Sequence, residues 1–332
     1  MDHRASRIRA RLSRLGGRAV TIQIIRPADR AAWLACRQKD VTASVAAAVL
    51  GAHPYVTAFS LWAEKTGRLS ADEEETEAME RGTLLEPVVV EMIRRRQPTW
   101  SVTYENDRAY YRDPTLRIGA TPDAFVDRPD RYGTGNCQIK TASEAAYREQ
   151  WLEPETGEVV PPTWIAVQAI TEAKLTGCTW ACVAVLVITW QGTLRLHIVD
   201  IPIHDRLWRR LCAAVAEFWE MAGTGREPDP DWLRDGNVVL DVYRDSRPIR
   251  LDLSANIDLD RAAGEYRDLK AAEASARSSA AVRRPQIIYA LKDAEIAETK
   301  NWEIVARTQQ GDPTKRVLRI KPRKERAHVG DF

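Results

Sequence analysis

The pattern of apolar and polar residues along the chain predicts an ordered series of strands and helices. Apolar runs bounded by turn residues are typical of strands, and apolar residues three or four positions apart are typical of helices. Up to residue 127 the pattern predicts a strand at 20–25, helices at 44–50, 58–66 and 81–96, and two extended runs meeting around 112–115. Ser44 is the expected N-cap of the first helix, and Gly51 its end. Pro87 either kinks the third helix or marks its first turn.

Beyond residue 127 a turn-rich segment leads into another strand–helix alternation. The pattern predicts a strand at 137–142, a helix at 161–176, strands at 178–190 and 194–203, and an amphipathic helix at 204–225. This order predicts a mixed sheet with helices packed on it, and hence an α/β or α+β fold. From about residue 236 the chain is rich in alanine and charge, which predicts an exposed helix or helical hairpin, followed by a terminal β-hairpin.

The composition is that of an ordinary globular protein, but its basic residues gather at the two ends. Of 332 residues, 44% are hydrophobic and 29% are charged, with a formal net charge of +2. Residues 4–18 carry six arginines and no acid, and residues 315–326 carry seven Lys or Arg against one acid, Glu325. Basic ends of this kind suit a polyanion such as DNA, although solvated tails have the same pattern.

Cysteine usage and hydropathy indicate a protein of the reducing cytosol. The five cysteines are scattered through apolar contexts, which favours core residues over disulfides, zinc ligands or an iron–sulfur cluster. The longest apolar run, 180–190, has eleven residues and is too short to span a bilayer. No apolar segment follows the N-terminal arginines, as it does in a signal peptide. We therefore expect a cytoplasmic protein with no membrane partner.

Several polar residues stand out against apolar surroundings. They are Glu86 on a helix, Asp123 after "GATP", Gln138 and Lys140 on a strand, and Gln168 on the next helix. Asp123 and Lys140 lie on strands joined by a turn, so they can converge at one edge of the sheet. Carboxylates in such a place hold one or two Mg²⁺ ions for phosphodiester hydrolysis, and the lysine stabilises the developing charge. Each residue alone has an ordinary explanation, as a turn residue or as a lysine that reaches solvent, but the ordered set favours catalysis.

This set resembles the PD-(D/E)XK nuclease superfamily, and more closely the YqaJ-like viral recombinases related to lambda exonuclease. The resemblance rests on "VTASVAAAVLGAHPYVTAFSLWAEKTG", "RGTLLEP", "GATPDAF", "QIKTA", "AVQAITEAKLTG" and "EFWEMAGTGREP", which occur in the family's order between residues 30 and 232. It implies a restriction-endonuclease-like core with a mixed central sheet over 20–235. A basic and flexible N-terminal arm is expected over 1–19. A C-terminal extension over 236–332, with a helical hairpin and a basic β-hairpin, resembles the arm that many phage members carry.

The resemblance also implies roles for individual residues. Asp123 matches the metal-binding aspartate and Lys140 the catalytic lysine, position 138 matches the acidic metal ligand, and Ile139 would add its backbone carbonyl. Glu86 would support a Mg²⁺ ion, for which Mn²⁺ can substitute, and Gln168 would organise the site from the following helix. Arg37, Ser44 and Thr121 fall where members that digest from a phosphorylated 5′ end hold that phosphate. An arginine beside a helix N-terminus gives a physical reason for such a pocket.

The departure from the family is Gln138, where the family usually has glutamate, although some branches of the superfamily tolerate glutamine. A glutamine oxygen can bind Mg²⁺ but carries no charge, so metal affinity should fall. The resemblance implies a Mg²⁺-dependent DNA exonuclease of phage or prophage origin, which digests linear duplex DNA 5′ to 3′ for homologous recombination. Two alternatives stay open: a catalytically weak DNA-end-binding protein, and an endonuclease of the same fold. The implied partners are duplex DNA ends, a single-strand annealing protein, and further copies of the chain in a ring-like trimer.

Overall fold

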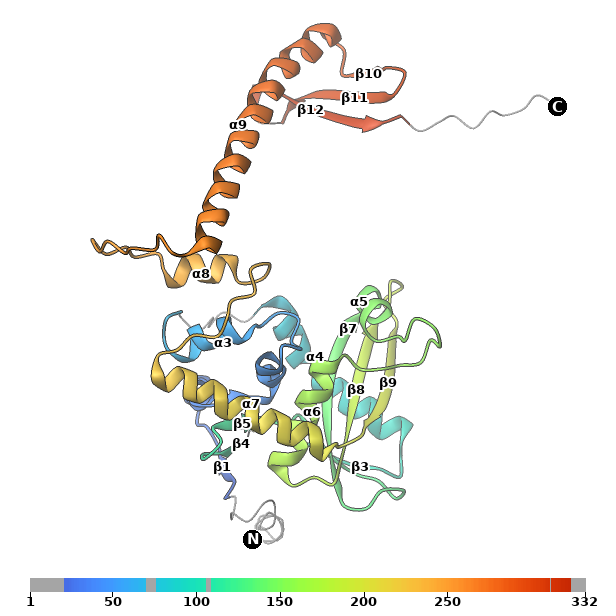
Figure 1. The fold of residues 1–332 in the computed structure, drawn as a ribbon. Helices are drawn as coiled ribbons and strands as arrows, with labels where there is room; N and C mark the ends of the chain where they lie inside the picture. The colour runs from blue at the N-terminus through green and yellow to red at the C-terminus, as the bar shows by residue number, and fades with distance from the viewer. Residues whose placement is uncertain (1–20, 70–75, 106–108, 311, 324–332) are drawn as a thin grey trace, which may run out of the picture. The chain divides into compact units, whose positions relative to one another are not determined.

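The computed structural model describes residues 21–69, 76–105, 109–310 and 312–323, and its contacts divide the chain into two units (Figure 1). The expected N-terminal arm, 1–19, lies outside the described residues. The first unit extends to Ser246, further than the expected boundary after residue 235. The reason is α8 (Gly236–Val242), whose Val238, Val239 and Val242 pack against the apolar core of the first unit.

The first unit is built on a mixed five-stranded sheet with the strand order β3-β6-β7-β8-β9. Its strands are β3 (Ser101–Tyr104), β6 (Ala124–Asp127), β7 (Thr134–Ser143), β8 (Trp180–Ile188) and β9 (Leu194–Ile201). The neighbours β7 and β8 run parallel, and the other pairs run antiparallel. A smaller sheet holds β1 (Gln23–Ile25), β4 (Tyr110–Asp113), β5 (Ile118–Ala120) and β2 (Val41–Thr42). The predicted class, a mixed sheet with helices packed on it, is confirmed.

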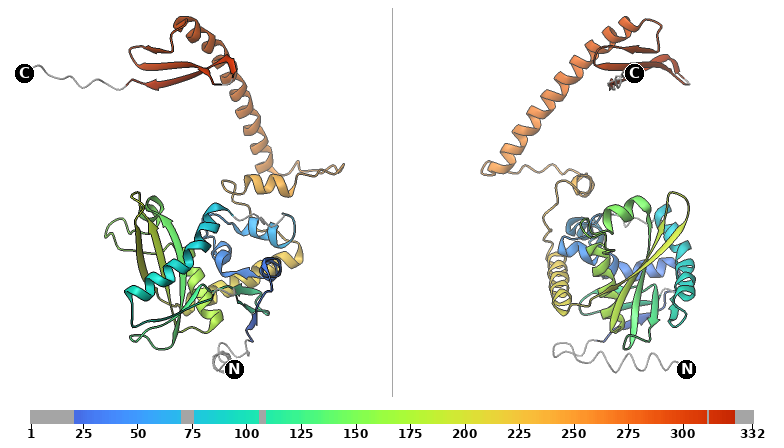
Figure 2. Two further views of the ribbon diagram at one scale, coloured as in Figure 1. Left: turned by 180° about the vertical axis from the view of Figure 1, so that it is seen from behind. Right: turned by 90° about the vertical axis from the view of Figure 1, so that its right-hand side faces the viewer.

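Alternation along β7 assigns each of its side chains to one of two helical layers. Cys137 and Ile139 pack with Val89 and Ile93 of α4 (Glu77–Arg96) on one face. The alternate residues of β7 face α6 (Thr163–Thr176). This helix and α5 (Glu144–Gln150) pack over the other face of the sheet (Figure 2). Because side chains alternate along a strand, Asn136, Gln138 and Lys140 share the α6 face.

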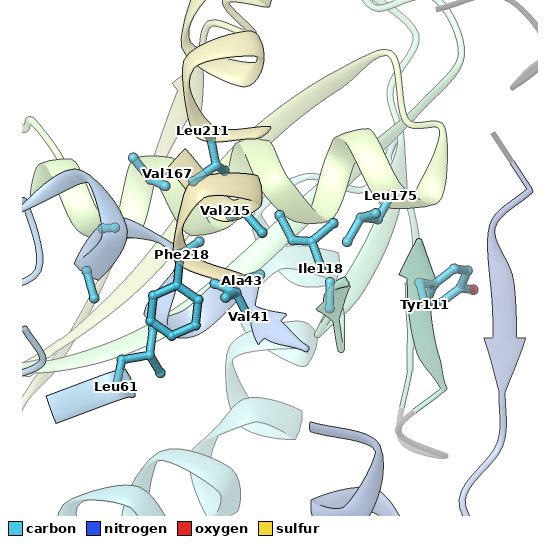
Figure 3. Packing of buried hydrophobic residues seen from close by; sticks show 14 of the residues in the cluster. Val41, Ala43, Leu61, Tyr111, Ile118, Val167, Leu175, Leu211, Val215 and Phe218 are labelled. Atoms are coloured by element: carbon cyan, nitrogen blue, oxygen red, sulfur yellow. The ribbon is translucent and has the colours of Figure 1, made fainter. Parts of the chain in front are cut away.

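Helix α6 is covered on its far side as well. Val167 and Leu175 pack with Ile118 of β5 and with Leu211 and Val215 of α7 (Asp205–Thr224), as Figure 3 shows. This second core also includes the 3₁₀ helix η1 (Ala43–Leu50) and α3 (Ala58–Lys65), and α2 (Arg30–Gln38) precedes β2 in the chain. Polar side chains of α6 are therefore buried between two layers rather than facing solvent.

Three local predictions need correction. The helix expected at 44–50 is a 3₁₀ helix that begins at Ala43, so Thr42 and not Ser44 occupies its N-cap position. Of the two alternatives for Pro87, a place in the first turn is wrong, because α4 begins four residues before the expected start and Pro87 lies inside it. The extended run 108–127 contains three strands rather than two, of which β4 and β5 belong to the small sheet and β6 to the large one.

The second unit has one long helix, α9 (Ile257–Leu291), and not a helical hairpin. The strands β11 (Trp302–Gln309) and β12 (Asp312–Pro322) form the expected hairpin, and β10 (Ile296–Glu298) adds a third strand to it. Arg316 holds this sheet to the helix end, since its guanidinium donates to the carbonyls of Lys292, Ala294 and Ala306. Within the described residues, no helix is long and apolar enough to cross a membrane.

Candidate active site

Asp123 and Gln138 meet because of the register between β6 and β7. Ala124 pairs with Cys137 in this antiparallel hairpin, so the residue before Ala124 lies beside the residue after Cys137. The Asp123 carboxylate accepts two hydrogen bonds on Oδ2, from the backbone N–H of Ile139 at 2.7 Å and from the Gln138 amide at 2.5 Å. The two expected metal-site residues are thus in direct contact.

The Gln138 amide nitrogen lies between two expected metal ligands. Its Nε2 is 2.5 Å from Asp123 Oδ2 and 3.3 Å from the carbonyl oxygen of Ile139. One carboxylate and one carbonyl oxygen therefore converge on a single donor atom, which carries partial positive charge. The other end of the amide, Oε1, is buried and has no hydrogen-bond partner in the described part of the chain.

The α6 face of β7 holds a second carboxylate, Glu172, which the sequence analysis did not identify. Glu172 is fully buried and accepts from Asn136 Nδ2 and from Gln168 Nε2, each at 2.9 Å. Gln168 is thus connected to the site through Glu172. Burial raises the pKa of Glu172 to about 7. Burial, together with repulsion by Glu172 and then Glu86, raises the pKa of Asp123 well above its ordinary value.

Lys140 and Glu86 complete the charges of the site. Lys140 lies on the same face of β7 as Gln138, and its ammonium nitrogen is 5.7 Å from the centre of the Trp164 ring. The ammonium makes no ion pair or hydrogen bond with any residue that the structure describes, and its charge favours the ionised forms of Asp123 and Glu172, which lowers their pKa values. Glu86, on α4, accepts a hydrogen bond from the Tyr104 hydroxyl at 3.0 Å.

The donor set around Asp123 consists of oxygen atoms, which are the ligands that Mg²⁺ prefers. Across the described ranges, no group of three or more His, Cys, Asp or Glu residues is arranged to hold a metal ion by itself. A cation here would therefore depend on neutral oxygens as well as carboxylates. Such oxygens are present in the Ile139 carbonyl and in the partnerless amide oxygens of Gln138 and Gln168. The residues fit a hard divalent cation.

A second polar cluster forms around Arg37 of α2. Its guanidinium donates to Ser44 Oγ at 3.1 Å and lies 4.4 Å from the centre of the Trp33 ring. Trp33 in turn donates from Nε1 to Thr121 Oγ1 at 3.0 Å. The structure thus brings together Arg37, Ser44 and Thr121, and adds Trp33. Burial lowers the pKa of Arg37, which forms no ion pair within the described residues.

The residues that the sequence analysis missed gave weak signals. Glu172 lies four residues after Gln168, a spacing that places both on one side of a helix. Trp33 lies four residues before Arg37, so these two side chains also share one side of their helix. Asn136 precedes Gln138 by two residues, so strand alternation places it on the same face. None of these types is unusual in a helix or strand, which is why only the contacts reveal their part in the site.

Comparison with known proteins gives one matching family model and several similar proteins. The model of the YqaJ-like viral recombinase domain matches residues 32–179. Protein YqaJ of Bacillus subtilis (strain 168) is 27% identical over 281 residues, which are 83% of this chain and 82% of that protein. Among solved structures, an alkaline exonuclease from Laribacter hongkongensis is 24% identical, with a TM-score of 0.44, over 63% of this chain and 98% of that one. A SOX–DNA complex is 9% identical over 61% of this chain and 70% of that one, with a TM-score of 0.38.

Proposed function

Since residues 32–179 of this chain match the model of the YqaJ-like viral recombinase domain, we propose that the protein is a metal-dependent deoxyribonuclease that degrades linear duplex DNA from its ends. The observation that carries the proposal is the convergence of Asp123 Oδ2 and the Ile139 carbonyl on one atom, Gln138 Nε2. Lys140, on the same strand face as Gln138, adds a cation that forms no ion pair within the described residues. Carboxylate, carbonyl and lysine in this order suit hydrolysis of a phosphodiester.

Each residue has a definite task in this proposal. Asp123, the Ile139 carbonyl, Gln138 and Glu86 would hold Mg²⁺ or Mn²⁺. The metal, when bound, would polarise the phosphate and activate water as the nucleophile. Lys140 stabilises negative charge that develops on the phosphate oxygens, because its ammonium has no competing ion pair in the described residues. Gln168 holds the carboxylate of Glu172 in position by donating a hydrogen bond to it.

The Arg37 cluster supports digestion from a 5′ end. An arginine with no acidic partner in the described chain, next to two hydroxyl groups, has donors available for a terminal phosphate. Thr121 joins this cluster to the catalytic residues, because it precedes Asp123 by only two positions. Removal of one strand from its 5′ end leaves a 3′ single strand. That product is what an annealing protein requires for recombination, and a ring of several copies would keep the enzyme on its substrate.

One observation favours a second function. Gln138 carries no charge and donates its amide to Asp123 instead of adding a second carboxylate beside it. A site with weak metal affinity would bind DNA ends without cutting them, and the protein would then act as a clamp. An endonuclease of the same fold would share all of these residues but would not need a DNA end.

A cleavage assay separates these functions. Linear duplex DNA, labelled at one end and with or without a 5′ phosphate, is compared with closed circular DNA in Mg²⁺ or in EDTA. The proposal predicts Mg²⁺-dependent loss of linear DNA only. Asp123→Ala and Lys140→Ala should each lower the rate by about 10³-fold or more while the far-ultraviolet circular dichroism spectrum stays unchanged. Binding without cleavage would identify the clamp, and nicking of the circle would identify an endonuclease. A well-folded Asp123→Ala protein with wild-type turnover would refute the mechanism.

A further inference from the structure

Glu172 is a buried acid whose partners do not neutralise it. Each of its oxygens accepts one hydrogen bond, from the amides of Asn136 and Gln168, which are both neutral. No ion pair involving Glu172 is present in the part of the chain that the structure describes. Burying a carboxylate with neutral partners alone is costly, because these donors do not cancel its charge. A purely structural residue at this place would be more stable as an amide or an apolar side chain.

The surroundings of Glu172 contain more acceptors than donors. The amides of Asn136, Gln138 and Gln168 all donate toward carboxylates, and the carbonyl oxygen of each is buried without a partner in the described residues. All three side chains are at least nine-tenths buried. These three partnerless oxygens and the carboxylates of Asp123 and Glu172 belong to one buried group of polar side chains that has more acceptors than donors. A bound cation would supply the positive partner that this group lacks.

We propose that Glu172 is the second carboxylate of the cation site and supplies from α6 the negative charge that Gln138 lacks on β7. The proposal rests on the proposed function and deepens it, since it identifies which acid accompanies Asp123. Both positions face the same space, because Gln138 lies between Asn136 and Lys140 on the α6 side of β7 and Asn136 is bonded to Glu172. An acid on the helix can therefore replace an acid on the strand without a change in the total charge around the cation.

Electrostatic effects within the site support this assignment. Glu172 contributes more than Glu86 to the raised pKa of Asp123, so Asp123 interacts more strongly with Glu172 than with the expected partner Glu86. Lys140 acts on both Asp123 and Glu172 and favours the charged form of each. The charges of Asp123, Glu172 and Lys140 are thus close enough to influence the pKa values of the two acids.

The test is a charge exchange measured by Mn²⁺ binding in the absence of DNA. Free Mn²⁺ is quantified by electron paramagnetic resonance for the full chain and for Glu172→Gln, Gln138→Glu and the double variant. We expect Glu172→Gln to weaken Mn²⁺ binding by about tenfold or more, and Gln138→Glu to strengthen it by a similar factor. The double variant should return to within about threefold of the wild type, since it restores the total charge. Glu144→Gln, which alters a buried glutamate of α5 outside the site, should leave binding unchanged.

Each outcome decides the proposal. If a folded Glu172→Gln protein binds Mn²⁺ as the wild type does, or if Gln138→Glu does not compensate for it, Glu172 has only a structural role. If Glu172→Gln does not fold, the double variant is compared with Gln138→Glu, because both contain the restored glutamate and differ only at 172. Asp123→Asn separates the metal site from the role of Glu172. If Asp123→Asn loses Mn²⁺ binding and Glu172→Gln keeps it, only this inference is overturned. If Asp123→Asn binds Mn²⁺ as the wild type does, the metal site is overturned as well.

Discussion

Gln138 alters the interactions of Asp123 in the site when no cation is bound. Its amide donates to Asp123, whereas a glutamate at that position would place a second negative charge against the same carboxylate. The glutamine therefore stabilises the metal-free protein and reduces the attraction for a cation. A carboxylate on α6 restores part of that attraction and keeps the repelling charges on different elements. Under the proposal, Gln138 therefore belongs to a site whose charge is distributed differently from the pattern that the family resemblance implies.

Glu172 should make the stability of the metal-free protein depend on pH. Its pKa is raised from 4.5 to about 7, so between these values the folded protein keeps a proton that the unfolded chain has lost. The free energy of unfolding therefore falls as pH rises through this window, by roughly 3 kcal/mol from Glu172 for a shift of this size. Asp123, whose pKa is also raised, adds a decrease of the same sign. Urea unfolding in EDTA from about pH 5 to about pH 8 measures this loss. Glu172→Gln should remove the share of this loss that Glu172 contributes, and superimposable pH profiles of the two proteins would contradict the assignment.

Arg37 should distinguish DNA ends that carry a 5′ phosphate from those that do not. If its guanidinium and Ser44 hold that phosphate, Arg37→Ala should slow digestion of phosphorylated ends by about tenfold or more and change hydroxyl ends much less. The matched control is Arg95→Ala, which removes an exposed arginine of α4 and should affect both ends alike. Single-turnover digestion of the two substrates provides the measurement. Equal slowing of both by Arg37→Ala would make Arg37 a general backbone contact or a fold residue.

At the scale of elements, the pair β4–β5 depends on a glycine. A Cβ atom added at Gly119 would lie 2.0 Å from the hydroxyl oxygen of Tyr110, which is fully buried and donates to Asp40. Gly119→Ala should therefore lower the free energy of unfolding by about 2–4 kcal/mol, because the ring cannot move without breaking that bond. Gly223→Ala on α7 meets no atom within 4 Å and should instead stabilise the protein by about 0.5–1 kcal/mol. Urea unfolding of both variants checks the contrast, which a neutral Gly119→Ala would contradict.

Elements with strong local signals were predictable from the sequence. Pro27, Gly51 and Gly177 lie where β1, η1 and α6 end, and the long apolar run 180–190 contains the strand β8. The β6–β7 hairpin followed from the turn residues between Asp127 and Thr134. These features are encoded within a few residues of each other, so the sequence alone is sufficient.

Other features depend on contacts distant in sequence, and the sequence gives little sign of them. Helix α6 is buried on nearly all sides, so its apolar residues show no stripe that would set Glu172 apart from the other side chains of α6. The 3₁₀ form of η1 and the position of α8 result from packing against the second core. In α9, neither Gly264 nor Pro285 ends the helix, because alanine and charged residues of high helix propensity surround both.

At the scale of the whole molecule, the second unit gathers basic residues in one place. A groove within it is lined by Arg277, Arg283, Arg284, Lys315 and Arg316, together with apolar residues that include Ile287, Val317 and Ile320. Arg316 and Arg284 are occupied within the unit, since they hold backbone carbonyls. Basic side chains that reach phosphates raise affinity for DNA without reading its sequence.

Two truncations should separate the contribution of this unit from that of α8. A protein that stops after Ser246 keeps the whole of the first unit, so it should fold, cleave DNA in Mg²⁺, and bind duplex DNA more weakly than the full chain. Its log affinity should also fall less steeply with log salt, by about 0.9 for each phosphate that the second unit neutralises in the full chain. A protein that stops after Asp235 lacks the packing of Val238, Val239 and Val242 on the core and should be measurably less stable. Thermal unfolding and fluorescence anisotropy at several salt concentrations test both points. An insoluble protein ending at Ser246, or one with an unchanged salt slope, would show that the second unit belongs to the fold or does not bind DNA.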